Sequence, residues 1–396
     1  MTPETAKQFA ELEAQAHALT RYFIDVGYEL VAPAIIQPAE VFLNAVGEDL
    51  RRRTYVFTDP EGSELCLRPD LTVPTCRLHW QRCKADGAGL LAKYCYNGPA
   101  FRFQPAGSPS AHPREFRQLG IEAFGDKDKE QAEINVLGLV ISAIKRAGVQ
   151  DYRVRIGDLG IFHNLLDALD LPVRWRERLR AQFWQPDAFR SELRQMTTRP
   201  DARIAGIPKE LITTLQGCDG PAAEHELLKY LDANEVPVLG ARSVSEIASN
   251  LLAAMEDALS DALPEETAGI IERYLEVVAP ARAAGARLGD LMSQNDVNID
   301  AALKTYQRRL KFLSEVDIDP SRVEFAAEFG RSLEYYSGFV FEVFVEDIGA
   351  ASPIAGGGRY DGLMRLAGAT TDVPAVGAMI HTERLLAAVS ETGRDG

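Results

Sequence analysis

The order of strand-like and helix-like segments constrains this fold more than any other feature. Apolar and polar residues alternate in hairpin-like segments before residue 125, and strand-like segments return after residue 320. Between about residues 160 and 315, nearly every segment has the apolar period of a helix. A parallel, doubly wound sheet would need regular β–α alternation, which this order lacks. We therefore predict an α+β domain, an antiparallel sheet flanked by helices, from residues 1–160 and 316–396, with a helical insertion subdomain at residues 161–315.

Charge and cysteine content narrow the class of partner. The chain of 396 residues carries a formal net charge of −15. Nucleic-acid binders usually present a basic field that releases counterions from phosphates, so this charge argues against a tRNA partner. Five cysteines are too few and too scattered for a disulfide framework, and no apolar run is long enough to cross a bilayer. We predict a cytoplasmic protein with no membrane partner.

Two short patterns could hold a metal or a phosphate, and each has a simpler explanation. Cys76, His79 and Cys83 share a helical face, but no fourth zinc ligand follows at a recognisable spacing, and buried cysteines beside a histidine explain them as well. The segment Gly356–Gly362 could place amides against a phosphate, but it lacks the end of a P-loop, and a tight turn is the alternative. We therefore predict no metal site and no cofactor.

Charged side chains inside apolar strands indicate a polar pocket. Arg102 lies in the strand-like FRFQ, and Glu122 lies within the apolar run LGIEAFG. Gln118 and Glu122 are four residues apart on one strand, so they share a face. A buried carboxylate needs a cationic or N–H partner, whereas a solvated edge is the simpler explanation for Arg102. Tyr335 and Tyr336 are expected to point to opposite faces, so that at most one lines the pocket.

Taken together, these segments resemble the catalytic domain of histidyl-tRNA synthetase, a class II aminoacyl-tRNA synthetase. The similar segments, in chain order, are LRPDLT, FRFQ with REFRQLGIEAFG (motif 2), RSLEYYSGFVFE, AGGGRYDGL and GAMIHTERL (motif 3). No single motif decides the matter, but their joint order is highly specific. The resemblance covers about residues 5–160 and 320–388, and it implies that the opening segment forms a homodimer.

The resemblance also implies a pocket for histidine, built from eight side chains: Asp70, Thr72, Arg102, Gln118, Glu122, Arg331, Tyr335 and Tyr336. Glu122 and Tyr336 would hold the imidazole, with Tyr335 nearby, since a carboxylate accepts from an N–H and a phenol adds a second polar contact. Arg102 and Arg331 would lie near the carboxylate of the ligand. Asp70, Thr72 and Gln118 would hold its α-amino group.

Three departures separate this chain from the family pattern of an active synthetase. Motif 2 has Gln104 where the family has a glutamate that helps to hold ATP. In motif 3, His381 replaces a glycine that lets a ligand approach the backbone closely, although Arg384 matches the position that clamps ATP. The family's anticodon-binding domain would follow motif 3, and we expect no such domain here.

Three interpretations follow from this pattern. An active or partial histidyl-tRNA synthetase would need ATP, magnesium and a tRNA surface, and a scaffold would keep only a vestigial pocket. The pattern most closely resembles the non-catalytic regulatory subunits of ATP phosphoribosyltransferase, which partner the short catalytic subunit in histidine biosynthesis. We favour this third interpretation, which implies no catalytic residues, a homodimer within a hetero-oligomer, and histidine as a feedback effector.

Overall fold

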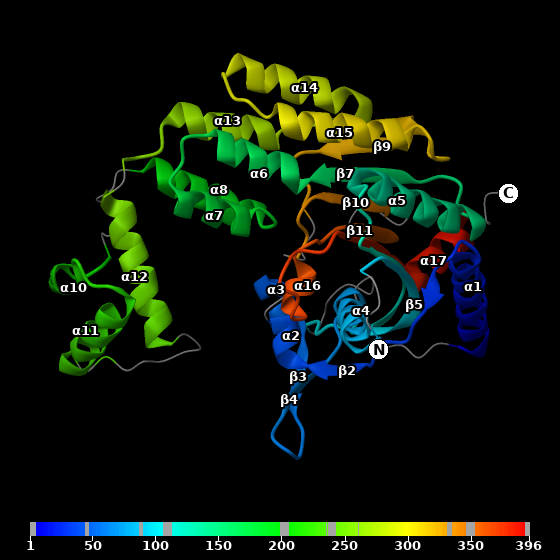
Figure 1. The fold of residues 1–396 in the computed structure, drawn as a ribbon, viewed down its shortest axis with the longest axis horizontal. Coiled ribbons are helices and arrows are strands. Elements are labelled where there is room, and N and C mark those ends of the chain that lie inside the picture. Colours follow the sequence, from blue (N-terminus) through cyan, green and yellow to red (C-terminus); the bar gives the residue numbers. More distant parts are fainter. Residues whose placement is uncertain are drawn as a thin grey trace. The chain divides into compact units, whose positions relative to one another are not determined.

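The computed structural model describes residues 5–43, 47–86, 90–105, 113–198, 206–234, 236, 243–259, 261–330, 335–345 and 353–392 (Figure 1). Arg331 and the motif 2 loop at residues 106–112 lie outside these ranges. The chain forms two compact units. The larger unit contains residues 1–172 and 273–396, and the smaller contains residues 173–272.

A nine-stranded sheet forms the centre of the larger unit. Its strands, in spatial order, are β1 (Glu29–Leu30), β5 (Ala92–Phe101), β6 (Glu115–Phe124), β12 (Ala375–His381), β11 (Ala355–Arg359), β10 (Phe339–Phe344), β7 (Arg153–Asp158), β9 (Val323–Ala326) and β8 (Val278–Pro280). Each neighbouring pair from β5 to β7 in this order is antiparallel: β5–β6, β6–β12, β12–β11, β11–β10 and β10–β7. Two pairs nearer the edges, β1–β5 and β7–β9, are parallel, so the sheet is mixed. The predicted α+β class with helices around a largely antiparallel sheet is confirmed.

A small second sheet holds the first predicted hairpin. It has the order β2 (Ile36–Pro38), β4 (Glu64–Leu67) and β3 (Tyr55–Thr58), all antiparallel. The turn between β3 and β4 is set by Asp59, whose Oδ1 accepts from the amides of Glu61 and Ser63 at 2.9 Å each. Gly62 follows with φ +90°, a conformation that costs glycine little. The helices α2 (Ala39–Leu43) and α3 (Gly47–Arg53) join β2 to β3.

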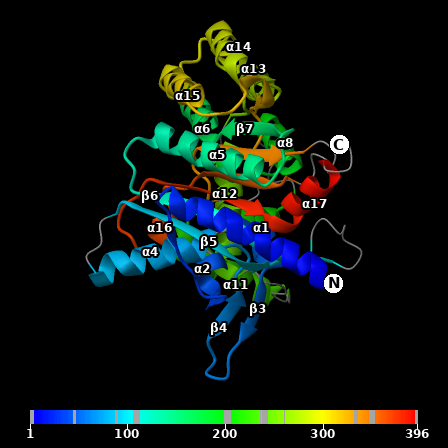
Figure 2. The same cartoon turned by 90° about the vertical axis from the view of Figure 1, so that its right-hand side faces the viewer.

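Helices cover both faces of the large sheet. α1 (Ala6–Asp25), α5 (Lys129–Arg146) and α17 (Thr382–Thr392) contact β5, β6 and β12 from one side, and lie in front of the sheet in Figure 2. α1 begins with a capping box between Thr5 and Gln8. On the other side, α4 (Thr72–Asp86), α2 and α16 (Leu363–Leu366) share an apolar cluster with Tyr94 and Phe124. We call these the α5 face and the α4 face of the sheet.

The glycine-rich segment near the C-terminus differs from its predicted form. The glycine-rich segment is a central strand, β11, not a turn, because its neighbours leave no room for side chains. A Cβ at Gly357 would lie 2.3 Å from the carbonyl oxygen of Gly377, and one at Gly358 would lie 2.6 Å from that of Phe339. GAMIH belongs to strand β12, and the final helix begins only at Thr382.

The smaller unit is helical. It contains α7 (Val173–Gln182), α8 (Pro186–Thr197), α10 (Lys209–Leu215), α11 (Gly220–Ala233), α12 (Val244–Leu259) and most of α13 (Glu265–Leu275). Leu211, Leu215, Ala223, Leu227 and Ala248 form an apolar core of its own. The insertion predicted at residues 161–315 extends beyond this unit at both ends and stays a prediction. α6 (Leu159–Ala168), α14 (Ala281–Gln294) and α15 (Asp300–Leu313) belong to the larger unit.

Within the described ranges, no helix combines the length and the apolar character that crossing a bilayer requires.

Candidate functional site

Glu122 lies at the centre of a polar cluster on the α4 face. It stands on β6, opposite Tyr94 of β5 and Gly377 of β12, and it is fully buried. A Cβ at position 377 would lie 1.5 Å from Oε2 of Glu122. Only glycine therefore leaves room for the carboxyl group at this point of the sheet.

Hydroxyl groups, and no cation, are the side-chain partners of Glu122 among the described residues. Tyr96 donates to Oε1 at 2.9 Å, and Tyr360 donates to Oε2. Burial raises the pKa of Glu122 to about 8, although hydrogen bonds from Tyr360, Thr72 and Tyr96 act in the opposite direction. The carboxyl group is therefore largely protonated at neutral pH, and a cationic or N–H ligand would favour its ionised form.

Asp70 is a second buried acid on the same side of the sheet. Its Oδ1 accepts from the amide of Val73 at 3.1 Å, and its Oδ2 accepts from the hydroxyl of Tyr335 at 3.5 Å. Burial raises the pKa of Asp70, against the attraction of nearby Arg102. Gln118 ties the same segment to β6, because its Oε1 accepts from the amide of Leu71 at 3.1 Å.

Arg102 is not the solvated edge residue of the simpler explanation. Its Nε donates to the carbonyl of Pro69 at 2.9 Å, and its guanidinium carbon lies 5.1 Å from the centre of the Phe116 ring. The side chain is half-buried and points toward the segment that carries Asp70. Arg102 is thus placed beside the acid rather than in solvent.

Tyr335 and Tyr336 lie together, so the prediction of opposite faces is wrong. Their ring centres are 4.8 Å apart, and they lie 5.8 Å and 6.4 Å from the centre of the Tyr360 ring. The two residues precede β10, which starts at Phe339, and strand alternation therefore does not apply to them. Both can line one pocket.

The structure thus brings seven of the eight predicted residues to one side of the sheet, and Arg331 lies outside the described residues. Sequence reasoning missed Tyr96, Tyr360 and Gly377. Tyr96 shares a face with Tyr94 by simple alternation, but its pairing with Glu122 requires the strand register. Tyr360 directly follows β11, and its pairing with Glu122 depends on where β11 lies in the sheet, which no local pattern gives.

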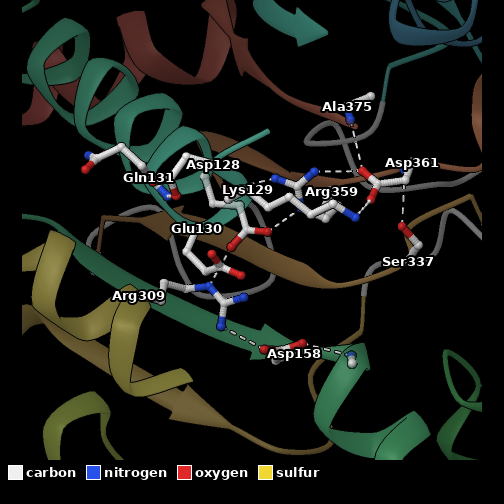
Figure 3. Close-up of polar contacts among 12 residues, drawn as sticks. Asp128, Lys129, Glu130, Gln131, Asp158, Arg309, Ser337, Arg359, Asp361 and Ala375 are labelled. Atoms are coloured by element: carbon white, nitrogen blue, oxygen red, sulfur yellow. Dashed lines mark hydrogen bonds and ion pairs between the residues drawn. The ribbon is translucent and has the colours of Figure 1, made fainter. Parts of the chain in front are cut away.

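An ion-pair network lies on the α5 face beside Tyr360, and Figure 3 shows its members Arg309, Arg359 and Asp361. Arg359 binds Glu133 of α5 through Nε and Asp361 through Nη1, the latter at 2.7 Å. Glu133 also accepts from Nε of Arg309 in α15 at 2.6 Å. Because Arg359 and Asp361 flank Tyr360, this network fixes the backbone that presents the tyrosine hydroxyl to Glu122.

The network extends to two further elements. Asp361 accepts from Nζ of Lys129 at 2.7 Å and from the amide of Ala375 at 2.9 Å. Arg309 also donates to Oδ2 of Asp158, at the end of β7, at 2.7 Å. Each buried charged group of this network therefore has a partner of opposite charge.

The two motif 3 residues that bear on ATP binding, His381 and Arg384, both contact other parts of this chain. His381 is buried opposite Gln118 in the β6–β12 register, with its ring centre 5.3 Å from that of Phe116. Arg384 donates to the carbonyl of Pro353 at 2.9 Å. Burial lowers the pKa of Arg384, and the like charge of Arg102 adds to this effect.

The candidate zinc ligands serve as packing groups. Nδ1 of His79 contacts the hydroxyl of Tyr94 and its Nε2 contacts the carbonyl of Leu90, both at 3.1 Å. The His79 ring stacks on Phe124 at 4.6 Å between centres. Over the described part of the chain, no group of three or more His, Cys, Asp or Glu side chains could hold a metal ion.

Comparisons with known proteins first define the class. The family model described as histidyl-tRNA synthetase matches residues 1–251 and 244–385. A Bacillus halodurans structure titled ATP phosphoribosyltransferase regulatory subunit/histidyl-tRNA synthetase superposes with a TM-score of 0.68, at 20% identity, covering 98% of this chain and 82% of that one. A histidine–tRNA ligase subunit from Alicyclobacillus acidocaldarius superposes with a TM-score of 0.60, at 24% identity, covering 99% and 96%. These matches show the class II synthetase fold.

Sequence relatives define the family within that class. The ATP phosphoribosyltransferase regulatory subunit of Agrobacterium fabrum is 35% identical over 363 residues, covering 89% of this chain and 91% of the relative. The subunit of the same name from Chelativorans sp. is 32% identical, with the same shares covered. The chain belongs to the family of ATP phosphoribosyltransferase regulatory subunits. The predicted family, that of the regulatory subunits, is confirmed.

Proposed function

We propose that this chain forms a homodimer within a hetero-oligomer with the short catalytic subunit of ATP phosphoribosyltransferase, raises that subunit's activity, and senses histidine through the cluster around Glu122. Family membership supports the regulatory role. The complex acts in the cytoplasm and does not bind tRNA. Regulation follows if histidine binds one quaternary state better than another.

The observation that carries the histidine site is a buried carboxyl group, Glu122, whose side-chain partners in the described part of the chain are all hydroxyl groups. A histidine side chain offers an imidazole N–H to Glu122, and burial makes an unpaired carboxylate unfavourable there. Asp70 and Gln118 lie on the same side of the sheet and suit the α-ammonium group. Arg102, beside Asp70, suits the carboxylate of the ligand.

Exposed apolar residues support the homodimer. β1 is an edge strand of the large sheet, and Leu30 on it is half exposed. Ile35 and Ile36, which follow on the chain, are also exposed. Exposed apolar side chains on edge strands, such as Leu30 on β1 of the large sheet and Ile36 on β2 of the small sheet, commonly mark a protein–protein contact.

The test is the turnover of the short catalytic subunit with and without this chain, followed by a histidine titration of the complex. We expect the chain to raise turnover, and histidine to lower it. Glu122→Ala and Tyr336→Phe should weaken histidine binding by calorimetry, roughly 10-fold or more for the charged group. Glu115→Gln is the matched control, because Glu115 is exposed on the same strand.

Two outcomes would contradict separate parts of the proposal. Unchanged turnover on adding the chain would remove the activating role. Normal histidine binding by Glu122→Ala in an intact complex would place the effector site elsewhere while leaving the regulatory role standing.

A further inference from the structure

A cavity lies on the α5 face of the sheet, behind Glu122. Its volume is about 310 Å³, which is within the range of small-ligand sites. Lys93 and Ala123, which pair across β5 and β6, line it. Their chain neighbours Tyr94 and Glu122 point to the α4 face, because successive strand residues alternate. The cavity is therefore separated from the Glu122 cluster by the sheet itself.

A buried phenol forms part of the wall of this cavity. Tyr28 lies between α1 and β1 and is only 4% exposed. Its backbone amide donates to the carbonyl of Phe23 at 3.0 Å, but its hydroxyl has no hydrogen-bond partner among the described residues. Because Tyr28 lines the cavity and its hydroxyl is not one of the fully enclosed polar atoms, this hydroxyl opens onto the cavity, where a ligand can accept a hydrogen bond from it.

Opposite charges line the same space. Nζ of Lys93 lies 5.9 Å from the centre of the Tyr28 ring, and Lys93 has no carboxylate partner within the described ranges. Asp126 lines the cavity too, and its Oδ1 accepts from the amide of Asp128 at 3.0 Å, its one hydrogen bond within the described ranges. Ser142 of α5 adds a hydroxyl group. Val136 and Leu139, with Val26 and Val316, form an apolar wall.

We propose that this cavity binds a small zwitterion of amino-acid size. The ligand's carboxylate lies against Lys93 and the Tyr28 hydroxyl, and its ammonium group lies against Asp126. The apolar wall accommodates a short side chain. This site is distinct from the proposed histidine site and does not depend on it.

The experiment measures the melting temperature of full-length Glu122→Gln with each of the twenty L-amino acids, so that binding at the Glu122 cluster is suppressed. We expect at least one amino acid to raise the melting temperature. Ser142→Trp, which fills the cavity, should abolish the shift, whereas Ser142→Ala should keep it. Lys93→Met should weaken binding about 10-fold or more, by calorimetry with the same amino acid.

Lys93 is exposed, so its variant tests the site even if Ser142→Trp fails to fold. The proposal is overturned if no amino acid shifts the melting temperature. It is equally overturned if the shift is undiminished in Lys93→Met or in a folded Ser142→Trp.

Discussion

Glu122 and Glu133 are both buried glutamates, on opposite sides of one sheet, but their surroundings differ completely. Glu133 is held between the guanidinium groups of Arg309 and Arg359. Glu122 has tyrosine and threonine hydroxyls and no ion-pair partner among the described residues. The first arrangement is complete without a ligand, whereas the second is completed by a proton or by a donor from outside. The comparison separates a structural charge cluster from a candidate sensor.

The largest expected effect comes from removing a cation beside Glu133. Arg309→Met leaves two buried carboxylates, Glu133 and Asp158, without this partner. Breaking a buried pair from one side typically costs about 3–5 kcal/mol. We expect a loss of that size in the free energy of unfolding, measured by urea titration at neutral pH.

The adjacent arginine is the control for this prediction. Arg308 pairs with Asp128 and Glu130 at 2.7 Å each, but its side chain is 50% exposed. Arg308→Met should therefore cost less than about 1 kcal/mol. Equal losses in the two variants would mean that burial does not set the strength of this network.

The second prediction concerns pH and Glu122. Because its pKa is raised from 4.5 to about 8, the folded state binds more protons than the unfolded state between these values. Stability therefore falls as pH rises through this window. At about 1.4 kcal/mol per unit, the contribution lost between pH ~5 and ~7.5 is roughly 3 kcal/mol.

Glu122→Gln should remove this part of the pH dependence, because an amide does not titrate. The check is urea unfolding of both proteins across the window, with stability compared at each pH. Parallel curves for the two proteins would show that Glu122 is not the titrating group.

The elements around Glu122 and Glu133 show which parts of the fold can be predicted from the sequence alone. The helix α1, the β3–β4 hairpin and the strands β5 and β6 follow from local periodicity, and motif order indicates the fold class. β11 was expected as a turn, because three consecutive glycines carry no strand signal of their own. Their conformation is set by the close approach of β10 and β12, which is tertiary information.

The candidate site likewise contains a residue that the sequence indicates and partners that only the tertiary structure reveals. Glu122 stands out in the sequence because a charge interrupts an apolar strand. Its partner Tyr96 lies on β5 and its partner Tyr360 directly follows β11, and no local pattern fixes the register of these strands. The Arg309–Glu133–Arg359 cluster joins residues far apart on the chain, so each member looks like an ordinary helical or strand charge.

The third prediction tests the space around Glu122. Gly377→Ala places a methyl group where Oε2 of Glu122 now lies, so the carboxyl group must move or the strands must separate. Overpacking of this kind typically costs about 1–3 kcal/mol, and histidine binding should be lost with it. Gly289→Ala in α14 is the control, because its Cβ would lie at an ordinary 3.7 Å from Leu303 and alanine favours a helix. Retained histidine binding in Gly377→Ala would contradict the assignment.

The smallest expected effect distinguishes two buried phenols. Tyr96→Phe removes the hydroxyl that donates to Oε1 of Glu122, and a single such bond contributes about 1 kcal/mol. Since that bond favours the ionised carboxylate, its loss should raise the pKa of Glu122 further and extend the fall in stability to higher pH. Tyr28→Phe removes a hydroxyl with no partner in the described residues, so it should leave the pH profile of the ligand-free protein unchanged. A pH profile that moves equally in both variants would mean that bulk packing, and not the hydrogen bond to Glu122, controls its ionisation.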